Sequence, residues 1–351
     1  MVGSISPQYT REGTGMNKAL TLIERIVIPH TAFADAQRQI EQCFAFSAGQ
    51  GPQGLAIVGE SGTGKTSLLE SFESKHEPIR RDNGMEVPVL RATVPSGPTV
   101  KSLAGKLLEA LNAPDPERGT ENEKSRRLRV LMKKSGTRMV MIDEFQHFYD
   151  RGKRQIMHNV ADWLKVLIDD TSTTLVVAGL SSCRNVIDGN EQLARRFLAP
   201  IQLPRFSWTD VGQRGQFICI LKAFHSEIAK QFEVPALHSE QMAFRFYCST
   251  GGLIGYLSNL LKQTLRNASI EERKVIRLGD LANAHVESVW SNEYISALPN
   301  PFERSFQLME SLDLLNQVSK IGAATEMAPN YSPRVGRGQV RQSIDSLLVR
   351  S

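Results

Sequence analysis

Short apolar runs alternate with segments of helical periodicity through the first two thirds of the chain. The apolar runs predict strands at residues 54–58, 87–92, 138–142, 174–178 and 200–203. Between them, apolar residues three and four positions apart predict helices at 65–74, 99–111, 122–134, 154–169 and 191–197. Such alternation predicts an α/β fold with a parallel sheet and helices on both faces. Ligands of such sheets bind at the carboxyl ends of the strands.

The pattern changes after Pro204, where amphipathic helices follow one another without intervening strands. These helices are predicted at residues 210–231, 239–249, 254–268 and 279–290. A further helix is predicted at 32–46, before the first strand. The chain therefore divides into a flexible N-terminal arm (1–31), an α/β domain (32–205), a helical domain (206–290) and an irregular C-terminal tail (291–351).

The loop after the first predicted strand reads GESGTGKT and fits the pattern G-x-x-x-x-G-K-T. Its glycines let backbone N–H groups turn inward toward an anion, and the following helix adds its positive dipole end. Lys65 would reach the β- and γ-phosphates of ATP, and the Thr66 hydroxyl would bind Mg²⁺. The predicted nucleotide contacts are Gly59, Glu60, Ser61, Gly62, Thr63, Gly64, Lys65, Thr66 and Ser67.

A second motif, a pair of acidic residues, follows the third predicted strand, where an apolar run ends in Asp143 and Glu144. Asp143 is the predicted second protein ligand of Mg²⁺, beside Thr66. Glu144 would orient and deprotonate the attacking water. An acid directly after the Mg²⁺ ligand favours hydrolysis over phosphoryl transfer to a small acceptor. The two motifs together predict an ATPase with ATP and Mg²⁺ as cofactors.

Composition excludes several classes of protein. The 351 residues are 41% hydrophobic, yet no apolar run approaches the roughly 20 residues that span a bilayer. The N-terminus lacks a signal-peptide pattern, and the four cysteines are scattered without metal-ligand spacing. We therefore expect a cytoplasmic protein with reduced thiols and no membrane partner.

Charge is modestly basic, with a formal net charge of +5 and a pI near 9.0. Such a balance is compatible with nucleic-acid binding without demonstrating it. Residues 124–138 carry seven basic side chains and no acidic one. This segment is either the solvated face of an amphipathic helix or a surface that follows a phosphate backbone.

Five segments of the chain resemble the TniB/TnsC family of transposition ATPases, which are AAA+ regulators of CRISPR-associated and related transposons. The likeness extends over about residues 25–290. Its segments are IVIPHTAFADAQRQI, IVGESGTGKT, VMIDEFQHF, LVVAGLSSCRNVIDGNEQLARRF and STGGLIGYLSNLLKQTLRNA. The strings N-E-Q-L-x-x-R-F and G-x-I-G-x-L are more specific to this family than the phosphate loop and the acidic pair.

The resemblance implies a P-loop NTPase sheet of the AAA+ type with a small C-terminal α-helical lid. It also implies rings or helical filaments, as hexamers or heptamers, around duplex DNA in the bacterial cytoplasm and nucleoid. Such oligomers bridge a TniQ-type target-selection protein and a DDE transposase, and hydrolysis remodels or disassembles them. One subunit inserts an arginine into the site of the next, and the candidate is Arg196, with Arg195 as the alternative.

Two positions depart from the family pattern. Leu180 stands where relatives often carry a threonine, with Ser181 as the nearest hydroxyl. Tyr256 stands where relatives often carry an arginine in the lid, and a phenol does not neutralise phosphate charge. Ser181 and Tyr256 are thus the predicted nucleotide contacts at these positions, and both departures predict slow hydrolysis that serves as an assembly switch.

DNA contacts are expected after the second strand, because in this family that segment reaches the duplex backbone from inside the ring. Here the segment reads RATVPSGPTVKSL, and the candidates are Thr99 and Lys101, with Arg91 behind them. The chain shows no base-reading motif, so contacts to phosphates are expected.

Two other functions fit parts of the sequence. The chain resembles in outline other AAA+ DNA-loading factors, such as helicase loaders, which would use the same site with a different partner. A monomeric signalling NTPase without a DNA role is the third possibility, and it leaves Arg196 without a function.

Overall fold

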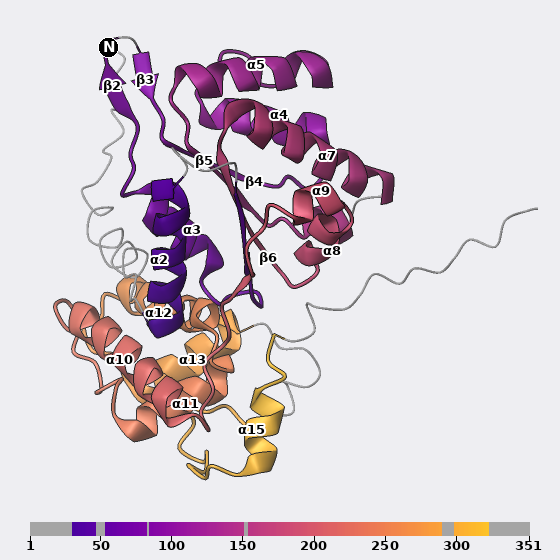
Figure 1. The fold of residues 1–351 in the computed structure, drawn as a ribbon. Helices are drawn as coiled ribbons and strands as arrows, with labels where there is room; N and C mark the ends of the chain where they lie inside the picture. Colours follow the sequence, from indigo (N-terminus) through magenta and orange to yellow (C-terminus); the bar gives the residue numbers. More distant parts are fainter. Residues whose placement is uncertain (1–29, 47–52, 83, 151–153, 290–297, 323–351) are drawn as a thin grey trace, which may run out of the picture.

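A computed structural model describes residues 30–46, 53–82, 84–150, 154–289 and 298–322, which form a sheet domain and a helical lid (Figure 1). The strands of the main sheet are β1 (Gly54–Val58), β4 (Val89–Thr93), β5 (Met139–Asp143), β6 (Thr174–Gly179) and β7 (Ile201–Gln202). All their pairings are parallel, in the order β4-β5-β6-β1-β7. A separate antiparallel hairpin consists of β2 (Ile79–Arg81) and β3 (Gly84–Glu86).

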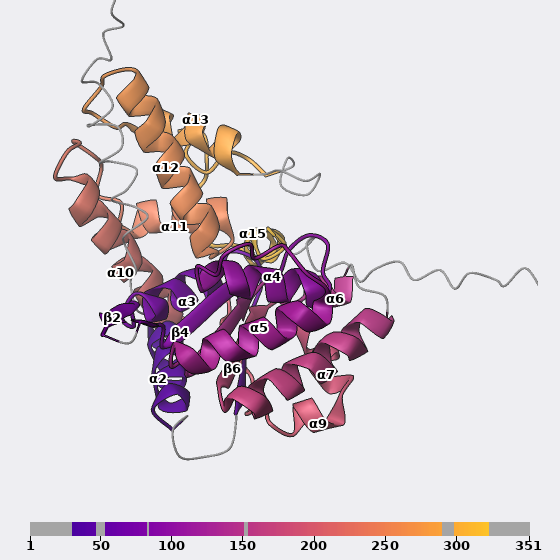
Figure 2. The same cartoon turned by 90° about the horizontal axis from the view of Figure 1, so that it is seen from above.

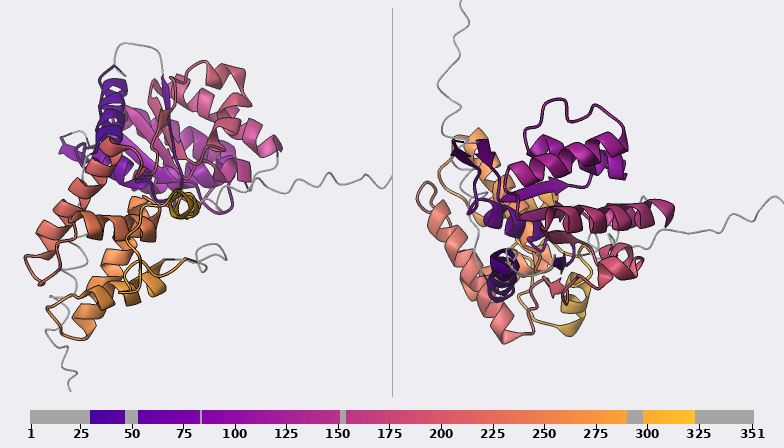
Figure 3. Two further views of the ribbon diagram at one scale, coloured as in Figure 1. Left: turned by 90° about the horizontal axis from the view of Figure 1, so that it is seen from below. Right: turned by 45° about the horizontal axis from the view of Figure 1, so that its top comes forward.

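Both faces of the main sheet are covered by helices, as the sequence predicts (Figure 3). One face packs on α2 (Thr31–Phe46) and α3 (Lys65–Glu73). The other face packs on α4 (Val100–Ala110), α5 (Glu121–Lys134) and α7 (Arg154–Thr171). Strand β5 is apolar throughout because both of its faces are covered. Met139 and Met141 pack in one core, and Val140 and Ile142 pack in the other.

The lid lies on one side of the sheet domain (Figure 2). Its helices are α10 (Val211–Ile228), α11 (Glu240–Thr250), α12 (Ile254–Ile270), α13 (Leu278–Ser288) and α15 (Leu312–Val318). They surround a core of their own that contains Trp208, Phe217, Phe224 and Phe246. The AAA+ arrangement of a parallel sheet followed by a helical lid is therefore confirmed.

Residues 298–322, within the predicted irregular tail, pack on the lid and contain one short helix, α15. Phe302, Phe306, Val318 and Ile321 are buried in the lid core, and α15 lies against α11. The two phenylalanines stand among polar residues without helical spacing, so periodicity does not reveal them. The remainder of the predicted tail, and residues 1–29 of the predicted arm, lie outside the described residues.

Every predicted strand and helix is present, with its ends within three residues of the expected ones. The helix expected at 191–197 is shorter, since α9 (Glu191–Ala194) ends where Phe197 forms a β-bridge with Gly54. The pattern also missed two short helices, α6 (His147–Asp150) and α8 (Cys183–Asp188), and the β2–β3 hairpin. Among the described helices, none combines the length and the apolar character needed to cross a bilayer.

Candidate functional site

The phosphate loop joins the fully buried strand β1 to α3, at the carboxyl edge of the sheet. Gly62 and Gly64 have φ of +83° and +97°, which only glycine adopts without strain. A Cβ at Gly59 would lie 2.4 Å from the carbonyl oxygen of Leu203, so the loop backbone is tightly packed there. The glycines of the motif are thus required by the conformation of this loop.

Lys65 begins α3 and is only 6% exposed. Its ammonium group donates to the carbonyl oxygens of Gly59 and Glu60, at 2.7 Å each. A buried ammonium at the start of a helix that follows a glycine-rich loop is suited to a phosphate group.

Thr66 and Asp143 meet at the edge of the sheet, although 77 positions separate them in the chain. The Thr66 hydroxyl donates to Asp143 Oδ2 at 2.7 Å, and Asp143 is 2% exposed. The described residues contain no cluster of three His, Cys, Asp or Glu side chains. One hydroxyl and one carboxylate fit Mg²⁺, which takes oxygen ligands and shares its coordination with phosphates and water.

A cavity of about 610 Å³ opens beside the loop, between the sheet domain and the lid. From the sheet domain it is lined by loop and α3 residues and by Glu144, which has a left-handed φ of 55°. The predicted contacts on this wall are Ser61, Gly62, Thr63, Gly64, Lys65, Thr66 and Ser67. Gly59 and Glu60 do not line the cavity.

An apolar wall of the cavity was missed from the sequence. It consists of His30, Phe33, Ile220 and Phe224. The His30 ring lies 4.9 Å from that of Phe206, and burial lowers the pKa of His30. A neutral, aromatic and aliphatic wall suits a nucleotide base. Phe33, Ile220 and Phe224 lie in predicted amphipathic helices and His30 in the predicted arm, and nothing in the sequence indicates their place in a site.

The lid wall of the cavity belongs mainly to α12. Ile254, Gly255, Ser258, Asn259 and Lys262 line it, at the spacing of one helix face. The Gly255 amide donates to the Gly62 carbonyl at 2.8 Å, and a Cβ at Gly255 would lie 2.8 Å from Gly62 Cα. The second glycine of G-x-I-G-x-L therefore permits the lid to touch the phosphate loop.

The two residues predicted at the departures from the family pattern are not in the cavity. Tyr256 packs against the lid core, and its ring approaches Gly322. Gly255, one position earlier, does line the cavity, since successive helical residues point about 100° apart. Ser181 is exposed in the turn after β6 and does not line the cavity.

Arg205 joins the two domains and was not recognised in the sequence. Its side chain is 14% exposed and forms an ion pair with Glu60, with Nε 2.9 Å from Oε1. It also donates to the carbonyl oxygen of Gly251, at 3.3 Å. Glu60 of the loop is thus held by the junction between sheet and lid, outside the cavity.

The candidate arginine finger lies at the opposite edge of the sheet. The Arg196 carbonyl accepts from Gly54 at the start of β1, whereas the phosphate loop follows its end. The Arg196 guanidinium binds Asp169 with distances of 3.0 and 2.8 Å. Arg195 is 75% exposed and pairs with Glu191. Neither side chain belongs to the cavity of its own subunit.

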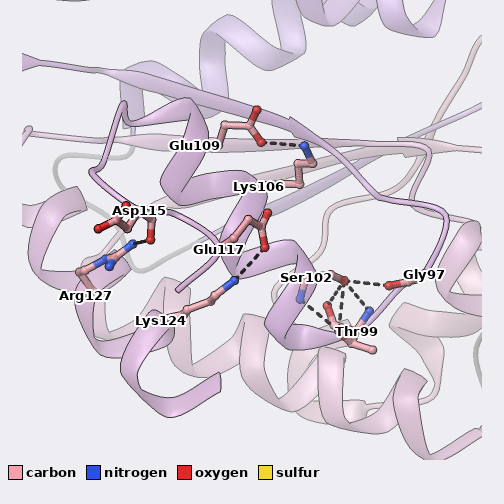
Figure 4. A network of polar contacts seen from close by, with 9 residues as sticks. All are labelled: Gly97, Thr99, Ser102, Lys106, Glu109, Asp115, Glu117, Lys124 and Arg127. Carbon is pink, nitrogen blue, oxygen red and sulfur yellow. Dashed lines mark hydrogen bonds and ion pairs between the residues drawn. The ribbon is translucent and has the colours of Figure 1, made fainter. Parts of the chain in front are cut away.

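The predicted DNA contacts do not form one cluster. Thr99 is the N-cap of α4, where it forms a capping box with Ser102 (Figure 4), and Lys101 is exposed on the first helical turn. Arg91 binds Glu73 at 2.5 Å on the α3 face of the sheet. Thr99 and Lys101 begin α4, which packs on the other face of the sheet, and the three residues stay predicted DNA contacts.

The basic segment 124–138 is largely committed to contacts within the fold. Lys124, with a side chain 1% exposed, binds Glu117 at 3.1 Å, and Arg127 donates to the Asp115 carbonyl (Figure 4). Arg129 and Arg138 donate to Asp170 and to the Phe44 carbonyl. These contacts favour the interpretation as a helix face. The cations Arg126, Lys133 and Lys134 remain exposed.

Solved structures support the fold at low sequence identity. The Cdc6p structure of Pyrobaculum aerophilum aligns with a TM-score of 0.57 and 14% identity, over 93% of this chain and 88% of that one. The ORC2 protein of Aeropyrum pernix, in its ADPNP–ADP complexes, aligns with a TM-score of 0.55 and 14% identity, over 79% and 74%. A search of curated proteins gives no match.

The family comparison agrees with the site. The family model described as "Bacterial TniB protein" matches residues 19–208, which include the phosphate loop, the acidic pair and both candidate finger arginines. The match covers more than half of the chain. The chain therefore belongs to the TniB family and has the fold of an AAA+ ATPase.

Proposed function

We propose that this protein is an ATP-dependent, DNA-binding regulator of transposition. It assembles on duplex DNA and links a TniQ-type target-selection protein to a DDE transposase, and hydrolysis remodels or disassembles the assembly. The observation that carries the ATPase part is the 2.7 Å contact between Thr66 and Asp143, next to Lys65 in the cavity. Membership of the TniB family supports the transposition part.

The residues of the sheet wall divide the work of binding and hydrolysis. The amides of the loop and Lys65 would bind the β- and γ-phosphates, while Thr66 and Asp143 would hold Mg²⁺. An ion held by these two residues would supply positive charge beside the phosphates. Glu144 orients the attacking water and accepts its proton.

The lid is placed to respond to the nucleotide. The Gly62–Gly255 hydrogen bond and the Arg205–Glu60 ion pair both join the phosphate loop to the lid. A nucleotide in the cavity would contact Ser258, Asn259 or Lys262 on α12 as well as the loop. Binding then changes the free energy of one lid orientation relative to another, and this difference drives assembly.

A second subunit completes the proposed catalytic site. Arg196 lies away from its own cavity and must reach that of a neighbour to act as a finger. Its ion pair with Asp169 has to open for this, so assembly and catalysis are linked. Arg195 is the exposed alternative.

Electron microscopy with duplex DNA tests the proposal. The full chain is imaged without nucleotide, with ADP and with a slowly hydrolysed ATP analogue. We expect rings or filaments on DNA only with the analogue, and their loss in Lys65→Ala and Arg196→Ala. Lys75→Ala, on the exposed end of the α3 region, is the matched control and should assemble normally. A protein that stays monomeric with every nucleotide and does not bind DNA would overturn the proposal.

A further inference from the structure

Gln146 lies two residues after the acidic pair, and the proposed mechanism gives it no role. The residue is 4% exposed, so its carboxamide must find its hydrogen-bond partners within the protein. It finds two, on different elements. Its Nε2 donates to Glu144 Oε2 at 2.5 Å, and its Oε1 accepts from the Leu180 amide at 3.2 Å.

The two partners fix the orientation of the carboxamide. A backbone amide only donates, so the atom that faces Leu180 is the oxygen. The nitrogen then faces Glu144, whose carboxylate accepts. Gln146 therefore forms a directed link from the end of β6 to the catalytic carboxylate at the end of β5.

The surrounding backbone is shaped around this link. A Cβ at Gly179 would lie 2.4 Å from Gln146 Oε1, so any other residue at Gly179 would displace the carboxamide. The carbonyl of Gly179 accepts from the amide of Gly59, the first residue of the phosphate loop, at 3.2 Å. The link thus extends from the phosphate loop through the end of β6 to Glu144.

Glu144 needs such support. Its φ of 55° is unfavourable for a non-glycine residue, and its side chain is 40% exposed at the cavity. His147 lies nearby, but its Nε2 is 3.7 Å from Glu144 Oε2, beyond a hydrogen bond. The Gln146 bond is therefore the short contact that fixes this carboxylate.

We propose that Gln146 is a positioning residue for ATP hydrolysis, which couples the end of β6 and the phosphate loop to Glu144. The Leu180 side chain cannot form a hydrogen bond, and Gln146, in the turn after β5, supplies a polar group at the end of β6. Its donated bond holds Oε2 of Glu144 and leaves Oε1 for the attacking water. Oε1 then takes the proton of the water, the water oxygen bonds to the γ-phosphorus, and the bond to ADP breaks. The inference rests on the proposed hydrolysis by Glu144.

Gln146→Met tests the link, because methionine has a similar length and makes neither hydrogen bond. Steady-state phosphate release and the affinity for a fluorescent ATP analogue are measured on the full chain with DNA. We expect kcat to fall roughly 10- to 100-fold, as for a slightly misplaced catalytic group, while the affinity changes less than about threefold. Gln155→Met, an exposed glutamine on α7, is the control and should match wild type.

Gln146→Glu gives a second test with a side chain of the same length. Its carboxylate accepts but does not donate, so the hydrogen bond to Glu144 Oε2 is lost and kcat should fall at least as far as in Gln146→Met. The affinity for the ATP analogue should again change less than about threefold, a split between kcat and affinity that a merely structural role would not give. Gln155→Met should match wild type in both measurements.

The outcomes separate the inference from the proposed function. If the wild-type protein releases no phosphate, the proposed ATPase fails and the inference with it. If wild type hydrolyses ATP, an unchanged kcat in Gln146→Met or in Gln146→Glu overturns the inference alone. Parallel loss of ATP affinity and kcat in Gln146→Met would assign Gln146 a structural role and overturn it as well.

Discussion

The two walls of the cavity differ in the groups that line them. The sheet wall consists of the phosphate loop, the buried Lys65 and the partly exposed Glu144, and the buried Asp143 accepts from Thr66 of this wall. The lid wall consists of side chains along α12 and of Ile220 and Phe224 on α10. A rigid polar wall suits chemistry on the phosphates, whereas a wall of separate side chains on a second domain suits sensing of the bound nucleotide.

The largest effect is expected on the sheet wall, at Glu144. Glu144→Gln removes the base and keeps the shape, so hydrolysis should fall about 10²- to 10⁴-fold while ATP still binds. Phosphate release and ATP titration measure the two quantities. Retention of more than a tenth of the wild-type rate would remove Glu144 from the mechanism.

The lid wall should show a smaller effect, at Lys262. Lys262→Met removes a cation from the cavity, and ATP affinity should fall about threefold to tenfold at low salt, because a partly exposed charge is partly screened. Isothermal titration calorimetry measures the affinity. Arg266→Met, one turn farther along α12 and exposed, is the matched control. Equal ATP affinities of Lys262→Met and Arg266→Met would indicate that Lys262 of α12 does not contribute to nucleotide binding.

The ion pair between Arg205 and Glu60, at the junction of the sheet domain and the lid, should stabilise the folded protein. Arg205→Met leaves the Glu60 carboxylate without its partner in a partly buried position, so the free energy of unfolding should fall by about 1–3 kcal/mol. Urea denaturation followed by circular dichroism measures the change. Arg195→Met breaks an exposed ion pair and should cost less than about 1 kcal/mol. A junction variant as stable as this control would contradict the assigned role.

Tyr256 should have the smallest effect. Its side chain lies in the lid and not in the cavity, so Tyr256→Phe should change ATP affinity less than about twofold. The same calorimetric titration measures it. A larger loss of ATP affinity would indicate that Tyr256 contacts the nucleotide, as the sequence predicts.

The contrast between the walls also explains how far the sequence could be interpreted. The residues Gly62 to Thr66 are consecutive, and their spacing alone predicts a phosphate loop. The contact of Thr66 with Asp143 follows from the fold. Asp143 ends β5, Thr66 lies in the first turn of α3, and both are at the carboxyl edge of the parallel sheet. The parallel sheet itself was predicted from alternating strand and helix patterns.

The remaining part of the site depends on tertiary packing that periodicity does not encode. Phe224 and Lys262 come from separate lid helices, and only the docking of the lid on Gly62 brings them to the cavity. Arg205 pairs with a residue 145 positions away, which no local pattern indicates. Tyr256 was assigned to the site from a motif position, although its helix turns it toward the lid core.

The central claim is that the cavity between these walls binds ATP with Mg²⁺. Calorimetric titration of ATP into the full chain, with Mg²⁺ and with excess chelator, tests it most directly. The account predicts binding by wild type that weakens without Mg²⁺, and a loss of at least about 100-fold in Lys65→Ala, which removes a charge-assisted contact to phosphate. Binding that is equal in Lys65→Ala and indifferent to Mg²⁺, or no binding by wild type, would contradict it.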